Sequence, residues 1–293
     1  RRTRLSTILI VIVTAASLFA GGLLGYSIGS SALQNQLSTL QEQISSLQWP
    51  HNVKYENVTY IQEQNTSLSL LYEQVKESVV VIQAITVQYD IFHRPYYTQV
   101  QGSGFVYNFT NRMVVITNNH VINDAINVSV TFTNGNGYTA TVLGSDPYAD
   151  LAVLSTDAPQ NEYKPIEIAS SSTLGVGDPV IAVGTPYGLT GSMTTGIVSA
   201  LGRIITEDLT GGYPIADVIQ TTTPLNPGNS GGPLLNYLGH VVGITTAIVS
   251  NSEGIGLAIP SNTILREISS LVTKGSYNQH PWLGAAGTDM TYA

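Results

Sequence analysis

The chain opens with its longest apolar stretch. Residues 5–28 are mostly apolar and carry no charge, and three arginines lie within the first four residues. At about 1.5 Å per residue, a 24-residue helix is long enough to cross a bilayer core of about 30 Å. The basic flank favours an outward-facing remainder. A cleaved signal peptide ending near residues 15–20 is the alternative, but the apolar run continues past those sites and favours a transmembrane anchor over residues 1–30.

A second pattern follows over residues 31–48. Leucine or isoleucine recurs at spacings of 4, 3, 4 and 3, at Leu33, Leu37, Leu40, Ile44 and Leu47. This is the seam of a two-heptad coiled coil. Two heptads are too short to associate alone, so a solvated amphipathic spacer helix fits the pattern equally well. Residues 49–66, which contain Trp49-Pro50 and two glycosylation sequons, are expected to be a linker.

From residue 67 the pattern changes to short β-branched runs separated by turn residues. Residues 68–77 predict a short helix, and Asn134-Gly135 predicts a hairpin turn between two of the strands. The predicted strands are 79–82, 104–107, 113–117, 128–132, 138–143, 151–154, 180–183, 193–201, 218–222, 240–246 and 256–259. Many short strands of this kind predict an all-β fold of two antiparallel six-stranded barrels, over about 75–160 and 166–260.

A helix is predicted over residues 262–274, capped by Ser261 or Asn262 and ended by Gly275. Its inward residues are expected to be Ile264, Leu265, Ile268, Leu271 and Val272.

Composition limits the function classes. Only 10% of residues are charged and the net charge is -8, which argues against a nucleic-acid partner. The absence of cysteine excludes disulfides and thiol or cysteine–zinc chemistry. Four sequons, at Asn57, Asn65, Asn108 and Asn127, are consistent with an extracytoplasmic location.

The candidate chemistry begins at Asn226-Pro227-Gly228-Asn229-Ser230-Gly231-Gly232-Pro233-Leu234. Three glycines within five residues let the backbone turn tightly around one hydroxyl, that of Ser230. A serine hydroxyl is a weak nucleophile that needs a base, a group that orients the base, and donors for an oxyanion. Ser230 is therefore predicted to be a nucleophile, although a serine between glycines is commonly only a turn residue.

A histidine and a carboxylate suited to these roles lie upstream. His120 occurs in TNNHVI and Asp150 in DPYADLAVL, each at the edge of an apolar run. Asp124 and Asp146 are rivals for the second role, but Asp146 precedes a proline, as turn residues do. The order His120, Asp150, Ser230 is that of chymotrypsin-type proteases.

These motifs, with GTPYGLTGSMTTGIVSALGR at 184–203 and GIGLAIPSN at 254–262, resemble the HtrA (Deg) family of trypsin-like serine proteases over residues 67–273. The resemblance implies the catalytic triad His120, Asp150 and Ser230 and an oxyanion hole made by the N–H groups of Gly228 and Ser230. It implies no cofactor and no metal. It also implies loops around 184–191 and 221–228 that rearrange on activation.

The sequence predicts a substrate preference because it lacks the pocket aspartate of trypsin. Pro224 stands six residues before Ser230, where trypsin has a pocket aspartate, so no carboxylate is available to pair a substrate Lys or Arg. A pocket near Leu225, Thr246, Ala247 and Ile255 is expected to take small or medium aliphatic side chains, although these residues are equally consistent with barrel core. An extended substrate would pair with a strand edge near Thr245 to Ala247.

The last segment, His280-Pro281-Trp282-Leu283-Gly284, resembles the start of the PDZ domain that follows the protease domain in this family, so residues 275–293 are expected to be a linker and the beginning of that domain. The expected protein is a membrane-anchored, extracytoplasmic endopeptidase, a homotrimer by resemblance, that cleaves unfolded polypeptides. A membrane-anchored holdase or stress sensor with secondary proteolysis is the alternative.

Overall fold

The computed structural model describes residues 67–185, 191–206, 214–248 and 254–281, together with six positions between residues 17 and 39. The chain divides into two compact units, Arg1–Asn65 and Thr66–Ala293. In the first unit the six described positions are all helical and exposed. Most of the predicted anchor, all five seam residues of the predicted coiled coil and the linker 49–66 lie outside the described residues. Among those that are described, no helix has the length and apolarity needed to cross a membrane.

The second unit begins with the helix α3 Leu68–Val75, followed by the 3-10 turn η1 Lys76–Ser78. Leu71 and Val75 of this helix are buried. The Tyr72 hydroxyl donates to the carbonyl of Gly191, at a distance of 2.5 Å. This contact ties α3 to the segment before β8 of the second barrel.

The first barrel closes in the strand order β1-β2-β3-β6-β5-β4, and every pair is antiparallel. Its strands are β1 Val79–Tyr89, β2 Pro95–Phe109, β3 Arg112–Thr117, β4 Ala125–Thr131, β5 Gly137–Asp146 and β6 Leu151–Thr156, with the short helix α4 Asn119–Ile122 after β3. Its interior is filled by β-branched and small residues such as Val80, Ile82 and Val106, all fully buried. Such residues pack well on a pleated surface.

The second barrel closes in the order β10-β11-β12-β9-β8-β7. Its strands are β7 Pro179–Gly184, β8 Ser192–Thr206, β9 Pro214–Thr221, β10 Pro233–Leu235, β11 Val241–Ile248 and β12 Gly256–Pro260. The connection from the first barrel carries the 3-10 turns η2 Gln160–Glu162 and η3 Ser171–Thr173. The predicted fold class, two closed six-stranded antiparallel barrels, is thereby confirmed.

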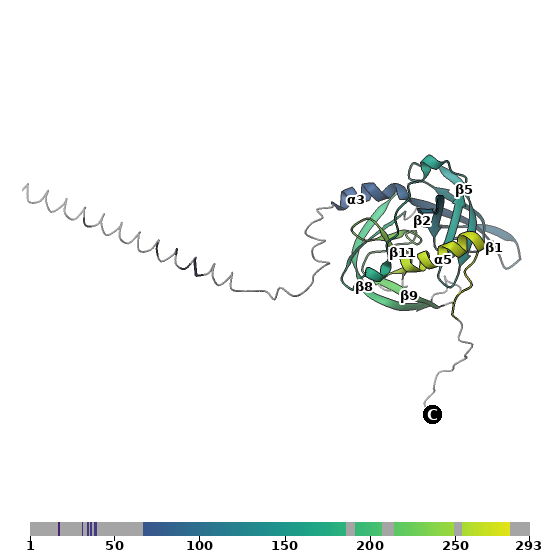
Figure 1. Ribbon diagram of the computed structural model, residues 1–293. Coiled ribbons are helices and arrows are strands. Elements are labelled where there is room, and N and C mark those ends of the chain that lie inside the picture. Colours follow the sequence, from purple (N-terminus) through teal and green to yellow (C-terminus); the bar gives the residue numbers. More distant parts are fainter. Residues whose placement is uncertain are drawn as a thin grey trace, which may run out of the picture. The chain divides into compact units, whose positions relative to one another are not determined.

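A third core joins the barrels. Ile116 of the first barrel, Ile181 of the second and Ile268 of the last helix belong to one cluster of buried side chains. That helix, α5 Ser261–Lys274, packs mainly against β5, β6 and β11, and so contacts both barrels (Figure 1). Residues facing outward from each barrel are thus buried where the barrels meet, which fixes the loops between them.

Helix α5 departs from its prediction at two points. It begins at Ser261, after Pro260, and no side chain caps its N-terminus, because the Ser261 hydroxyl donates to the carbonyl of Ala169 instead. Leu265 was predicted to face inward but is 43% exposed. The helix ends as predicted, with Gly275 in the left-handed conformation.

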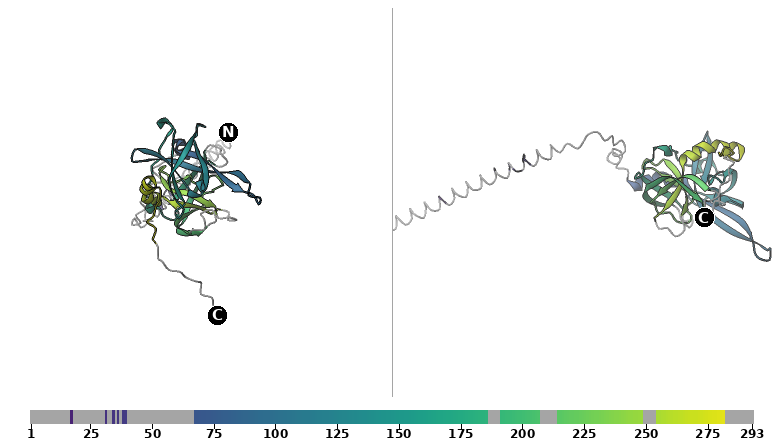
Figure 2. Two further views of the ribbon diagram at one scale, coloured as in Figure 1. Left: turned by 90° about the vertical axis from the view of Figure 1, so that its right-hand side faces the viewer. Right: turned by 90° about the horizontal axis from the view of Figure 1, so that it is seen from below.

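Strands β1 and β2 form a hairpin that extends beyond the barrel (Figure 2). Their pairing runs from Val79 opposite Phe105 out to Tyr89 opposite Pro95. The sequence predicted only the inner parts of these strands, because the tip is exposed and the further buried positions of β1, Ala84 and Thr86, are small or polar. Strand β10 was also not predicted, since its three residues directly follow the glycine-rich motif.

Candidate functional site

Asp150 lies in the turn between β5 and β6 and has a positive φ of 50°. Aspartate is one of the few residues other than glycine that adopt this left-handed region with any frequency. The conformation is held from the neighbouring segment, where the Asn118 amide donates to the Asp150 carbonyl at 2.9 Å. The turn thereby directs the carboxylate of Asp150 towards α4.

His120 is the second residue of α4 and receives that carboxylate. The backbone N–H of His120 donates to Asp150 Oδ1 at 2.9 Å, and its Nδ1 lies 2.8 Å from Asp150 Oδ2. The Asp150 side chain is 0% exposed and that of His120 is 11% exposed. A buried carboxylate on Nδ1 favours the tautomer whose Nε2 is free to accept a proton.

Ser230 lies in the loop between β9 and β10, which turns back on itself twice. The N–H of Asn229 donates to the carbonyl of Asn226 at 3.0 Å, and the N–H of Gly232 donates to that of Asn229 at 2.9 Å. Gly231 has a φ of 88°, and an added Cβ there would collide with the carbonyl of Ser103. Glycine is therefore required beside Ser230, as the motif predicted.

The Ser230 hydroxyl is hydrogen-bonded to a residue other than His120 in this structure. It donates to the carbonyl of Thr246 at 2.8 Å, and no hydrogen bond joins Ser230 to His120 among the residues that are described. The Thr246 hydroxyl in turn donates to Asp150 Oδ2 at 2.6 Å. Thr246 of β11 thus contacts both Ser230 and Asp150, and the three predicted triad residues gather around it.

The predicted oxyanion hole has two backbone N–H groups, those of Gly228 and Ser230. Within the described part of the chain neither donates to another group. Their carbonyls are both occupied, because Ser103 donates its N–H to the Ser230 carbonyl at 2.8 Å and its hydroxyl to the Gly228 carbonyl at 2.6 Å. The loop is held from its carbonyl side, which leaves two donors for an anion.

Ser103 was not predicted to belong to the site. Its hydroxyl also accepts from the N–H of Thr185 at 2.9 Å, so one side chain of the first barrel holds two segments of the second. The pattern Gly102-Ser103-Gly104 could have indicated it, since flanking glycines permit close approach of backbones. An added Cβ at Gly102 would lie 3.0 Å from the Ser230 carbonyl.

The predicted substrate residues divide into three groups. Leu225 and Ile255 are partly buried and pack against two different core clusters. Thr246 has the bridging position described above, and the side chain of Ala247 lies outside what the structure describes. Leu225 lies beside Gly256, the residue that follows Ile255, and the pocket that these residues would line stays a prediction.

Thr245 is a correction to the prediction. Its side chain is fully buried, and its hydroxyl donates to the carbonyl of Asn229 at 2.6 Å. Its own N–H and carbonyl pair with Gly232 and Gly231. The backbone of Thr245 is therefore not free to pair with a substrate, and Thr245 instead supports the loop that carries Ser230.

Comparison with known proteins adds to this geometry. Residues 102–244 match the family of trypsin-like peptidase domains. Protease Do-like 1, chloroplastic, from Arabidopsis thaliana is 41% identical over 217 residues, which are 73% of this chain and 49% of the relative. A probable periplasmic serine endoprotease DegP-like of Brucella suis is 43% identical over 187 residues, 63% of this chain and 35% of that protein. The chain therefore spans about half or less of these relatives.

Solved structures agree. The HtrA-type protease AlgW with decapeptide is 30% identical with a TM-score of 0.60, and the match covers 72% of this chain and 69% of that one. The same protease with tripeptide is 32% identical with a TM-score of 0.61, covering 71% of this chain and 64% of the other.

Proposed function

The chain belongs to the HtrA family of trypsin-like serine proteases, and we propose that it is an endopeptidase in which Ser230 is the nucleophile. The observation that carries the proposal is the set of contacts around Thr246. They bring a buried carboxylate on His120 Nδ1 and the hydroxyl of a glycine-flanked serine to the same residue.

The reaction follows from these positions. Ser230 Oγ attacks the carbonyl carbon of the peptide bond while His120 Nε2 takes the hydroxyl proton. Asp150 stabilises the imidazolium that results, and His120 then gives the proton to the leaving amine, so that an acyl-enzyme remains. Water activated by His120 releases the acid and restores Ser230.

The negative charge of the tetrahedral intermediate falls on the former carbonyl oxygen. The N–H groups of Gly228 and Ser230 are the donors proposed to receive it. One such donor stabilises the transition state by about 3 kcal/mol. This role agrees with the two N–H groups having no acceptor of their own in the described part of the chain.

One rearrangement is required before the first step. The Ser230 hydroxyl must leave the carbonyl of Thr246 and turn towards His120 Nε2. We propose that the arrangement in this structure is a resting one and that a bound substrate, with the loops around 184–191 and 221–228, favours the turned hydroxyl. Rotation about one side-chain bond is enough to move the hydroxyl.

Substrate preference is proposed from the residues before Ser230. Residues 221–229 contain no acidic side chain, and Pro224 occupies the position of the trypsin pocket aspartate. Small or medium aliphatic side chains such as Val, Ala, Ile and Leu are therefore the proposed residues before the cleaved bond. Unfolded polypeptides are the proposed substrates, because an extended segment must reach the loop.

Location and assembly are proposed from the sequence and from the relatives. The uncharged residues 5–28 and the periplasmic naming of relatives support an extracytoplasmic protease attached to the membrane. A homotrimer is proposed by family resemblance. Retained suppression of client aggregation by a Ser230→Ala variant would favour the holdase as the principal function.

The test is digestion of unfolded casein by the purified full chain. Ser230→Ala is expected to reduce cleavage by at least about 10⁴-fold, because removal of a triad member leaves only binding and oxyanion stabilisation. Ser269→Ala, on the exposed face of α5, is the matched control and is expected to cleave normally. Cuts after Lys or Arg would refute the proposed preference, and equal cleavage by Ser230→Ala would refute the proposed nucleophile.

A further inference from the structure

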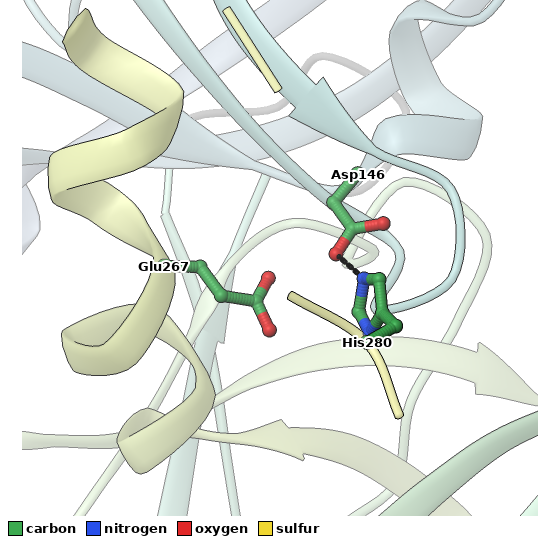
Figure 3. Close-up of side chains that lie close together, drawn as sticks. All are labelled: Asp146, Glu267 and His280. Carbon is green, nitrogen blue, oxygen red and sulfur yellow. Dashed lines mark hydrogen bonds and ion pairs between the residues drawn. The ribbon is translucent and has the colours of Figure 1, made fainter. Parts of the chain in front are cut away.

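A second group of ionisable side chains lies outside the predicted triad. It consists of Asp146, Glu267 and His280, at the end of β5, in the middle of α5 and in the segment after α5 (Figure 3). One ligand atom from each residue lies within 4.8 Å of the other two. Asp146 and Glu267 are buried, and His280 is partly buried. The fold therefore brings two carboxylates and one imidazole together from three separate elements.

The ring of His280 is held in position from three sides. Its Nε2 lies 2.6 Å from Asp146 Oδ2. The ring of Tyr277 meets it edge-on with centroids 5.0 Å apart, and the ring of Tyr148 lies 5.2 Å away at a tilted angle. Nε2 therefore already points into the group, which reduces the cost of ordering the side chain when it binds a ligand.

Glu267 is the residue that points to a ligand. Its side chain is 0% exposed. Its Oε1 accepts from Arg266 at 2.6 Å, whereas its Oε2 has no hydrogen-bond partner in the described part of the protein. The carboxylate faces the Asp146–His280 pair (Figure 3). A buried carboxylate oxygen without a partner is costly, and native proteins normally satisfy such atoms.

We propose that Asp146 Oδ2, Glu267 Oε2 and His280 Nε2 bind a divalent transition-metal ion, Zn²⁺ in the first place. Two carboxylate oxygens and one imidazole nitrogen suit Zn²⁺, whereas Ca²⁺ and Mg²⁺ prefer oxygen ligands alone. The two carboxylates balance the charge of the ion, and Arg266 keeps its bond to the other oxygen of Glu267. The ion takes the place of the Asp146–His280 hydrogen bond.

The geometry requires only a local adjustment. Ligand atoms about 2.1 Å from a tetrahedral zinc ion lie about 3.4 Å apart, which is between the 2.6 Å of the Asp146–His280 contact and the 4.8 Å span of the group. A cavity of about 470 Å³, lined by His280, Tyr277 and Arg266 among others, adjoins the site. It gives the ion an entry route and leaves room for water as a fourth ligand.

Metal binding would connect α5 to the turn that carries Asp150. Asp146 Oδ1 accepts from the N–H of Tyr148 at 3.0 Å. Tyr148 belongs to the turn between β5 and β6, which also contains Asp150. An ion on the other oxygen of Asp146 therefore fixes that turn to the last helix and the segment after it. The expected effect is a higher unfolding temperature in the presence of Zn²⁺.

The test is titration of the metal-stripped full chain, in a Ser230→Ala background that prevents self-digestion. Calorimetric titration with Zn²⁺ is expected to show one ion per chain, and Co²⁺ is expected to give the visible absorption bands of a four-coordinate site. Glu267→Gln keeps the side-chain shape and is expected to weaken binding at least about tenfold, and His280→Ala is expected to do the same.

His240→Ala is the matched control, because the Nε2 of His240 lies 3.5 Å from Glu167 Oε2 in a more exposed histidine–carboxylate pair. It is expected to bind Zn²⁺ normally, as is His120→Ala. Absence of binding in the parent chain would overturn the proposal. So would Zn²⁺ affinity that is unchanged in Glu267→Gln and His280→Ala while both variants retain the parent's circular dichroism.

Discussion

At the residue scale, Thr246 stands out because it contacts two residues of the predicted triad. Its hydroxyl donates to the carboxylate of Asp150 and its carbonyl accepts from Ser230. The sequence indicated Thr246 only as part of an apolar pocket and of a strand edge that would pair with substrate. The bridging role depends on β11 of one barrel lying against the Asp150 turn of the other, which no local pattern contains.

Thr246→Val keeps the shape of the side chain but removes the hydroxyl that donates to Asp150. A hydrogen bond to a charged group contributes about 1.5–3 kcal/mol, so kcat/KM is expected to fall by about 10–100-fold. Thr246→Ser keeps the hydroxyl and is expected to remain near wild type. If Val and Ser at this position had equal activity in a peptide assay, the hydroxyl would have no positioning role.

Glu267 predicts a pH dependence of stability in metal-free protein. Burial raises the pKa of Glu267 from 4.5 to about 7, against the opposing hydrogen bond from Arg266. Between these two values the unfolded chain has lost the proton while the folded chain keeps it. Folding stability from this group therefore falls as pH rises from about 4.5 to 7.

Glu267→Gln cannot ionise and is expected to be more thermostable than the parent at pH 8, with the difference shrinking towards pH 5, when melting is measured with chelator present. Glu162 offers a control, because its pKa is shifted in the opposite direction from that of Glu267. Hydrogen bonds from Asn136 and Asn134 hold the pKa of Glu162 below its usual value, so Glu162→Gln is not expected to stabilise at pH 8. If Glu267→Gln raised the melting temperature by the same amount at both pH values, the raised pKa of Glu267 would be contradicted.

At the element scale, the β1–β2 hairpin has two parts with different energetics. Its inner part lines the barrels, whereas residues near its tip expose large side chains such as Ile91, Phe92 and Tyr97. The sequence predicted strands only where burial produced a recognisable apolar pattern. Near the tip, Val87 to Tyr89 pair with β2 through the backbone and none of the three is buried, so the sequence shows no hydrophobic alternation there.

Two phenylalanines at this hairpin test the difference. Phe105 is 0% exposed and Phe92 is 69% exposed. Phe105→Ala is expected to cost about 3–5 kcal/mol of unfolding free energy, and Phe92→Ala about 0.5 kcal/mol or less. Calorimetric unfolding in the Ser230→Ala background measures both. Similar losses for the two variants would mean that the tip is buried against something in solution.

At the scale of the whole molecule, the double barrel was predictable because every barrel strand except β10 carries a local apolar signal and the strands recur at short intervals. The three residues proposed as the triad could also be identified from the sequence, since each lies in a motif. Their supporting contacts were not. Ser103, Asn118 and Thr246 act across the boundary between segments or barrels, and no motif indicates the hydrogen bond from the Ser230 hydroxyl to the Thr246 carbonyl.

The cluster of Asp146, Glu267 and His280 also arises from contacts between segments that are distant in the sequence. In the sequence, Asp146 was a rival of Asp150 at a turn position, and His280 was only part of the final segment. Helix α5 brings Glu267 beside both residues, because the helix packs against both barrels. A site assembled from three distant elements becomes visible only when the fold is known.

The proposed function depends on Ser230 being a nucleophile activated by His120 within this fold. Labelling of the full chain with a fluorophosphonate, followed by mass spectrometry of the labelled peptide, tests this role. One adduct is expected, on Ser230, and it is expected to be lost in His120→Ala and retained in the control His240→Ala. An adduct on another serine, or equal labelling of Ser230 in His120→Ala, would contradict it.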